Sequence, residues 1–358
     1  MQRLNTLLPV LAAGIALVTD WAIPDSSLHP AANRPYFLLV MAVALALTAV
    51  LFLAGFAAPA FQKKYSGKAP FYTGILLFLC VLNILTAKTA TLPVLYFPSL
   101  DRVFGVLVED AAFLGKCLLY SLRLQVTGWV SGAVAGVLTG VAIGFSKGAR
   151  YWIYPLVRVL GPIPSTAWIP LAMISFPTVV SASAFLIALA VWFPTSVLTA
   201  SGISSIPNAY FEAAATLGAS NRYALWKVGI PAAMPHMFLG LFNGTTASFI
   251  TLVTAEMMGA KYGIGWYVNW QKDMMAYANV YAGLIVMSVI CYCIITLLFR
   301  ARDHVLVWQK GVIKRTFHLR GEQAVHQPPG RSHHCPIQCR SGHRPRFFYL
   351  PHRPLRVR

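Results

Sequence analysis

The chain has 358 residues, of which 57% are hydrophobic and only 11% are charged, and its net charge is +19. Soluble domains carry about a quarter charged residues, so this composition excludes an ordinary soluble enzyme. The apolar residues form blocks of about 20 or more, long enough to cross about 30 Å of hydrocarbon, whereas barrel strands alternate over about 10 residues. We therefore expect an all-α, polytopic helical membrane protein.

Eight membrane spans are predicted from the apolar blocks, with expected bounds 4–23, 36–60, 71–92, 117–145, 155–176, 180–203, 236–258 and 280–299. The loops after the second, fourth, sixth and eighth blocks carry clusters of Lys and Arg. The positive-inside rule therefore places these loops and both chain termini in the cytoplasm. Because the remaining positive charge gathers in residues 310–358, the basic balance does not indicate nucleic-acid binding.

The fourth predicted span carries glycines at every fourth position: Gly128, Gly132, Gly136, Gly140 and Gly144. On a helix this spacing forms a slowly winding groove, and small residues let a neighbouring backbone approach closely in lipid. The groove is interpreted as a helix-packing face. A contact that slides between two transport states remains the alternative.

The fifth predicted span is rich in prolines: Pro155, Pro162, Pro164, Pro170 and Pro177. Each proline removes a backbone donor and discourages helix at the preceding residue. A broken helix at membrane depth is tolerated only where protein or a watery cavity satisfies the freed carbonyls. The segment 161–167 is therefore either a buried, kinked helix end or part of a solute path that includes Pro162 and Pro164.

Glu256 is expected near the outer end of the seventh span. An acid within a span is costly, which makes a role in gating or solute contact a hypothesis. The alternative is that its carboxylate reaches water or bonds a neighbouring backbone group.

The stretch Pro207–Pro231 is a polar, helix-forming island between apolar blocks. Pro207 suits a helix start and Gly218 suits the position just past a helix end. Ser220 is a predicted N-cap for a second short helix, and Pro231 is expected to close the unit. Two short cytoplasmic helices joined at a glycine are therefore predicted.

This island resembles the EAA loop of permease subunits in binding-protein-dependent, type I ABC importers. The motif runs E-A-A, three residues, G, nine residues and then I-x-L-P. The matching residues are Glu212, Ala213, Ala214, Gly218, Ile230 and Pro231, with Val228 in place of the first Ile and Ile230 in place of Leu. The segments 161–171 and 252–266 also resemble the nitrate, sulfonate and taurine branch of these permeases.

The resemblance implies a six-span permease core with two additional N-terminal spans. The expected domains are a two-span extension at 1–65, a permease domain at 66–305 with its coupling loop at 204–231, and a basic, disordered cytoplasmic tail at 306–358. The histidine-rich stretch 333–343 of this tail matches no closed metal motif. No metal-ligating or catalytic residue is therefore predicted.

The family's partners follow from the same resemblance. The chain has no G-x-x-x-x-G-K-[ST] loop, so ATP and Mg are expected on a separate ABC ATPase that engages the coupling loop. An extracytoplasmic solute-binding protein, a second permease copy and a bacterial inner membrane are also implied. The solute is expected to be small, such as nitrate, a sulfonate or taurine. A secondary transporter or a membrane-embedded enzyme remains the alternative, although the spans lack clustered ionisable residues.

Overall fold

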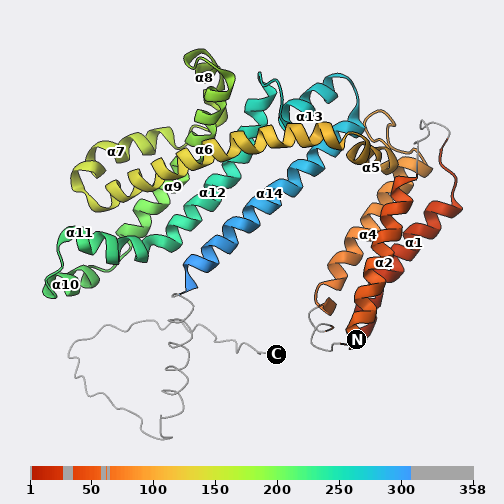
Figure 1. Cartoon of the computed structure of the whole chain (residues 1–358), viewed down its shortest axis with the longest axis horizontal. Helices are drawn as coiled ribbons and strands as arrows, with labels where there is room; N and C mark the ends of the chain where they lie inside the picture. The colour runs from red at the N-terminus through yellow and green to blue at the C-terminus, as the bar shows by residue number, and fades with distance from the viewer. Residues whose placement is uncertain (1, 27–34, 58–61, 63–64, 308–358) are drawn as a thin grey trace, which may run out of the picture. The chain divides into compact units, whose positions relative to one another are not determined.

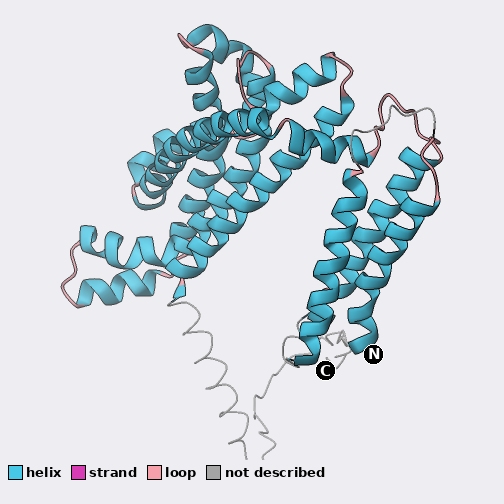
Figure 2. Ribbon diagram, turned by 45° about the vertical axis from the view of Figure 1, so that its right-hand side comes forward, coloured by secondary structure: helices cyan, strands magenta, loops and turns pink. Residues whose placement is uncertain are grey.

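The structure, a computed structural model, describes residues 2–26, 35–57, 62 and 65–307. Within these ranges all regular elements are helices, which confirms the all-α expectation (Figure 2). Seven of the described helices are long and apolar enough to cross a membrane, or up to eight if one bent pair counts as a span. The main helices in chain order (Figure 1) are α1 (Gln2–Ala22), α2 (Tyr36–Ala57), α4 (Ala69–Asn83), α5 (Leu100–Glu109), α6 (Ala111–Phe145), α7 (Lys147–Leu160), α8 (Ile169–Ser175), α9 (Val179–Ser204), α10 (Asn208–Thr216), α11 (Asn221–Ala224), α12 (Ile230–Met257), α13 (Ile264–Asp273) and α14 (Tyr277–Val305).

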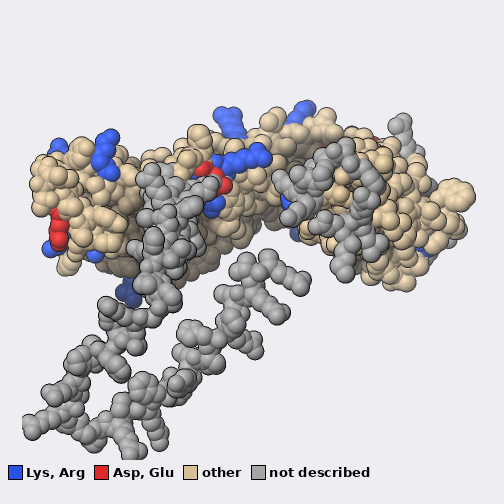
Figure 3. Space-filling model, turned by 90° about the horizontal axis from the view of Figure 1, so that it is seen from below, with Lys and Arg blue, Asp and Glu red and all other residues tan. Residues whose placement is uncertain are grey.

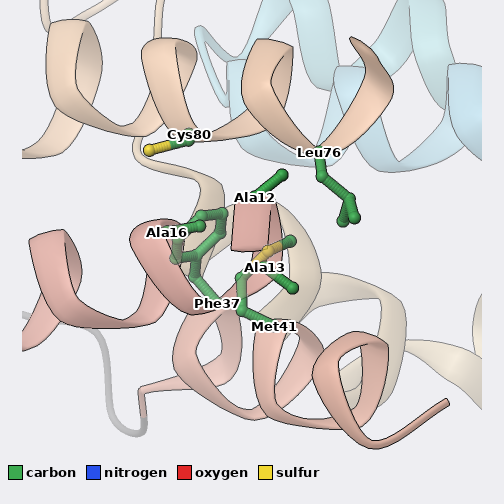
Figure 4. Close-up of a cluster of buried hydrophobic side chains, with 7 residues drawn as sticks. All are labelled: Ala12, Ala13, Ala16, Phe37, Met41, Leu76 and Cys80. Carbon is green, nitrogen blue, oxygen red and sulfur yellow. The ribbon is translucent and has the colours of Figure 1, made fainter. Parts of the chain in front are cut away.

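The three N-terminal helices α1, α2 and α4 pack on one another. Figure 4 shows the apolar cluster that they share: Ala12, Ala13, Ala16, Phe37, Met41, Leu76 and Cys80. The alanines of α1 present little side chain, so the neighbouring helices can approach closely, as is usual between helices in lipid. The helix α4 therefore packs with the two helices of the predicted extension. The expected domain boundary at residue 65 stays a prediction.

Lys88 forms ion pairs at one end of this three-helix bundle. Lys88 Nζ lies 3.1 Å from Asp20 Oδ1 and 2.7 Å from Asp25 Oδ1, and the Lys88 side chain is only 4% exposed. Asn83 donates a 2.8 Å hydrogen bond to the Asp20 carboxylate. Because an unpaired buried charge is costly, these partners let Lys88 sit at the end of an apolar span.

The five glycines that recur every fourth position of α6 face α9. A Cβ on Gly128 would lie 2.6 Å from Ile187 Cβ, and a Cβ on Gly136 would lie 2.7 Å from Thr195 Cβ. Gly132, Gly140 and Gly144 meet Ala188, Thr199 and Ile203 of α9 at similarly close range. The groove predicted from the glycine spacing therefore receives α9 along its length. Whether this seam slides stays a prediction.

A second face of α6 meets α12 through polar side chains. The residues Ser121, Gln125 and Trp129 recur every four positions and so lie on one side of the helix. Their partners on α12 are Glu256 (2.7 Å), Ser248 (2.6 Å) and Thr245 (2.7 Å), respectively. Side-chain hydrogen bonds between helices contribute to association in lipid, where the hydrophobic effect does not. The helix α6 thus holds α9 with a glycine face and α12 with a polar face.

The fifth predicted span is a bent pair of helices. The helix α7 begins at Lys147, before the predicted start at 155, because the Ser146 hydroxyl accepts a hydrogen bond from Ala149 N–H and caps it. The chain then breaks at residues 161–164, and the direction changes by 88° between α7 and the helical segment that starts at Ser165. The prolines predict the position of this break correctly.

Charged side chains are sparse on the surface that Figure 3 shows, where most of the described atoms are neither acidic nor basic. This distribution fits helices that face lipid along most of their length. The tail at 308–358, with the histidine-rich stretch 333–343, lies outside the described residues.

Candidate functional site: the loop between α9 and α12

The predicted polar island forms two short helices, α10 and α11, as the sequence chemistry indicates. Pro207 directly precedes α10. Gly218 follows it with φ +81°, in the left-handed region that favours glycine. The Ser220 hydroxyl accepts a 3.3 Å hydrogen bond from Tyr223 N–H and caps α11. The turn between the two helices therefore depends on Gly218 and Ser220.

The expectation that Pro231 closes this unit is wrong. A π-helical turn, Leu225–Gly229, follows α11 and leads directly into α12, so residues Asn221–Met257 form one continuous helical stretch. Ile230 N–H bonds to Leu225 O, five residues back. A proline at the first turn of a helix lacks only a donor that need not be used, so Pro231 is accommodated next to the wider turn.

The outer surface of the loop is both apolar and exposed. The exposed large side chains are Leu217 (87%), Trp226 (67%), Tyr210 (60%) and Tyr223 (56%). Of the motif residues, Glu212, Ala213 and Gly218 are exposed, whereas Ala214, Ile230 and Pro231 are half-buried against the rest of the unit. Apolar and aromatic side chains that gather on a polar loop mark an interaction site. We define the loop surface as the exposed faces of Pro207–Trp226.

A cavity of about 300 Å³ lies at the break between α7 and α8. It is lined by the segment 160–166, by α9 at 189–194 and by α12 at 243–251. Its polar lining consists of uncharged side chains, among them Ser165, Thr166, Asn243 and Thr251, and the hydroxyls of Ser165 and Thr251 lie 2.6 Å apart.

Backbone atoms add to this polar lining. Pro194 has no N–H to donate to the carbonyl of Ala190, and both residues border the cavity. Of the residues predicted for a solute path, Pro164 lines the cavity, whereas Pro162 and Glu256 do not appear among its lining residues.

Glu256 is instead fully buried where three helices meet. Its carboxylate accepts hydrogen bonds from Ser121 Oγ at 2.7 Å and from Gly265 N–H at 2.8 Å. Ser121 Oγ in turn accepts a 2.9 Å hydrogen bond from Ile264 N–H. Gly263, with φ +134°, packs directly on the carboxylate. Glu256 thus joins α6, α12 and the start of α13, and of the predicted alternatives its geometry fits a bond to neighbouring backbone.

Among the described residues, no group of three or more His, Cys, Asp or Glu side chains is arranged to hold a metal ion.

Comparison with known proteins identifies the class of this architecture. Residues 132–306 match the family model described as "Binding-protein-dependent transport system inner membrane component". The taurine transport system permease protein TauC of Escherichia coli is 32% identical over 42% of this chain, and the alignment spans 55% of that protein's length. The bicarbonate transport system permease protein CmpB of Synechococcus elongatus is 29% identical over 71% of this chain and 92% of its own length.

Among solved structures, an inward-facing conformation of the MetNI methionine ABC transporter aligns with 55% of this chain and 98% of its own chain, at 19% identity and a TM-score of 0.46. The matched region of the family model runs from the middle of α6 to the end of α14 and contains both the loop surface and the cavity. Residues 132–306 are therefore similar to binding-protein-dependent transport system inner membrane components, and the chain is similar to the permease proteins of solute transport systems.

Proposed function

We propose that this chain is the permease through which a small solute crosses the membrane, driven by a separate ABC ATPase that binds the loop surface. One observation carries the proposal: the loop presents four exposed large apolar side chains next to Glu212, in a chain similar to this family. A partner's groove would bury these side chains, as it does for other short amphipathic helices. ATP and Mg belong to that ATPase, and the permease itself performs no chemistry.

The cavity beside the α7–α8 break is our proposed part of the solute path. Its lining offers hydroxyls, an amide and the Ala190 carbonyl, so a solute exchanges its water hydrogen bonds for protein hydrogen bonds as it passes. Its volume of about 300 Å³ suits a small solute such as taurine, nitrate, bicarbonate or a sulfonate. An extracytoplasmic binding protein delivers the solute in this proposal.

The working unit that we propose is a homodimer in a bacterial inner membrane, with both termini in the cytoplasm. The chain carries one loop of this kind and no evident internal repeat, so two copies give two ATPase-binding loops around one symmetric path. The basic start of α7 and the loop lie at the same end of the spans, since Phe145 contacts Phe211. This arrangement supports a cytoplasmic position for both.

The docking proposal is tested with Glu212→Lys and Gly218→Asp. Glu212 is exposed in a short helix and can reach a donor on a partner, and Lys reverses its charge. An aspartate at φ +81° costs about 1 kcal/mol or more and distorts the turn between α10 and α11. We expect both variants to reach the membrane but to lose co-purification of the partner ABC ATPase.

The matched control is Asp273→Lys, which reverses an exposed charge at the end of α13. It is expected to leave ATPase co-purification unchanged. Full ATPase binding by both loop variants would overturn the proposed docking site. Native mass spectrometry of the purified complex gives the stoichiometry, and a complex that contains a single 39.2 kDa permease copy would exclude the homodimer.

A further inference from the structure

The loop touches the ends of the spans at a ring contact. The ring of Phe211 on α10 packs edge-on against the ring of Phe145 at the end of α6, with centroids 5.8 Å apart and planes at 75°. A hollow of about 370 Å³ lies beside this pair, and its lining comes from the ends of α6 and α9 and from α10 and α11. Because the hollow leaves space between the loop and the spans, the ring pair bridges the two.

Arg150 ties three helices together at the same place. From the first turn of α7, its guanidinium donates to the carbonyls of Ile143 (3.1 Å) and Gly144 (3.3 Å) at the end of α6. It also donates to the hydroxyl of Ser204, the last residue of α9, at 2.8 Å. A cation on the last carbonyls of a helix satisfies acceptors that have no intrahelical partner. The ends of α6 and α9 and the start of α7 are therefore held as one unit.

The helix α7 connects this unit to the cavity. It has 14 residues and so spans about 21 Å. Val157 is fully buried and belongs to a cluster with Ile143 of α6 and Ala200 of α9, so one face of α7 packs against these two helices. Its last residue, Leu160, and the following Gly161 line the cavity. The helix α7 therefore links the Arg150 contacts at its start to the cavity wall at its end.

We propose that the Phe145–Phe211 ring pair and Arg150 transmit movement of the docked loop, through α7, to the wall of the solute cavity. This inference rests on the proposed function. Phe211 and Arg150 are positioning residues: they control coupling and are not needed for docking. Their positions fit this role, since Phe211 is half-buried on the inner side of α10 and the exposed loop surface lies on the outer side.

The test measures docking and cavity movement separately. A reporter, Asn243→Cys, is placed on the cavity wall in a chain whose six native cysteines are replaced by serine. The permease with its ABC ATPase is reconstituted in nanodiscs and labelled with a membrane-impermeant maleimide, with no nucleotide and after trapping with ATP and vanadate. In the otherwise unchanged reporter protein we expect the labelling rate to differ about tenfold between the two states.

With Phe211→Ala or Arg150→Gln, the ATPase should co-purify at the unchanged ratio while the labelling rates of the two states converge to within about twofold. Phe211→Tyr keeps the ring and should restore the difference. Phe145→Ala combined with Phe211→Ala should be no more severe than either change alone, because both remove the same contact. The matched control is Phe78→Ala, which removes an exposed ring from α4.

One contrary result is that the Phe211→Ala variant loses both ATPase binding and the difference in labelling rate between the two states. That result would place Phe211 in the docking surface and overturn the proposal. Unchanged labelling differences in both Phe211→Ala and Arg150→Gln would also overturn it. Failure of the reporter protein itself to bind the ATPase would be a different result, since it would overturn the proposed function.

Discussion

At the scale of single residues, Glu256 shows how a buried carboxylate in a span can be satisfied without a cation. Its described partners are the Ser121 hydroxyl and the Gly265 N–H, both of them neutral donors. Glu256→Gln keeps an acceptor for Gly265 N–H, and Ser121 Oγ can accept from the new amide. We therefore expect this variant to keep near-normal thermal stability and transport.

Glu256→Ala leaves the Gly265 N–H unpaired and opens a cavity, so it should lower the free energy of unfolding by about 1–3 kcal/mol or more. Thermal unfolding in detergent, paired with a transport assay, separates the two possible roles of Glu256. A stable Glu256→Gln protein that no longer transports would show that the charge itself takes part in gating.

The single residues that the sequence predicts correctly are those whose requirement is local. Gly218 needs a positive φ and Ser220 caps the next four residues, so spacing within the loop is sufficient to find them. Phe211 and Arg150 have ordinary neighbours in the sequence, and their partners lie on other helices. Such contacts are set by tertiary packing and leave no signal in a single sequence. The prediction that Pro231 closes the unit is wrong because a π turn next to it also accommodates a proline.

At the scale of the helices, a single substitution can test whether the glycines of α6 form its packing contact with α9. A Cβ on Gly136 would lie 2.7 Å from Thr195 Cβ and 3.0 Å from the carbonyl oxygen of Trp192, which is too close for any side chain. Gly136→Leu should force α6 and α9 apart and strongly reduce the amount of folded protein in the membrane, measured by size-exclusion chromatography after solubilisation.

Gly115→Leu is the matched control on the same helix, because a Cβ there meets nothing within 4 Å. Equal yields of folded protein from both variants would show that the glycine seam is not a packing contact.

The apolar blocks predict most helices correctly. In the bilayer no water is present to bond backbone N–H and C=O groups, so each apolar block must pair these groups within itself, as a helix does. The break at 161–164 was also predictable, since its glycine and prolines act locally. The start of α7 at Lys147 cannot be predicted in the same way, because Lys147 and Arg150 give its first turn the polar composition of a loop. The polar face of α6 was missed for another reason. Ser121, Gln125 and Trp129 do recur at helical spacing, but only the structure shows that α12 supplies their partners.

At the scale of the whole molecule, the described contacts divide into the bundle of α1, α2 and α4 and the helices that hold the loop and the cavity. Two hydrogen bonds link the bundle to α5: Phe37 N–H donates to Asp101 at 2.8 Å and the Tyr36 hydroxyl donates to Glu109 at 3.1 Å. The loop and the cavity draw their residues from α6 to α12. The N-terminal helices are therefore not part of the proposed coupling route.

Deleting residues 1–65 tests this division of the chain. The deletion removes two candidate spans, an even number, so the positive-inside rule keeps the remaining loops on their original sides. It also removes Asp20 and Asp25, which pair with Lys88, so the deletion is combined with Lys88→Met to avoid an uncompensated charge.

We expect this shortened permease to co-purify with the ABC ATPase at the full-length ratio, because α10, α11 and the helix ends that carry them keep all their described contacts. Full-length Lys88→Met serves as the control for the substitution alone. If the shortened chain inserts normally but no longer binds the ATPase, the bundle supports the loop through contacts with the α6–α14 region, and residues 1–65 belong to the functional core.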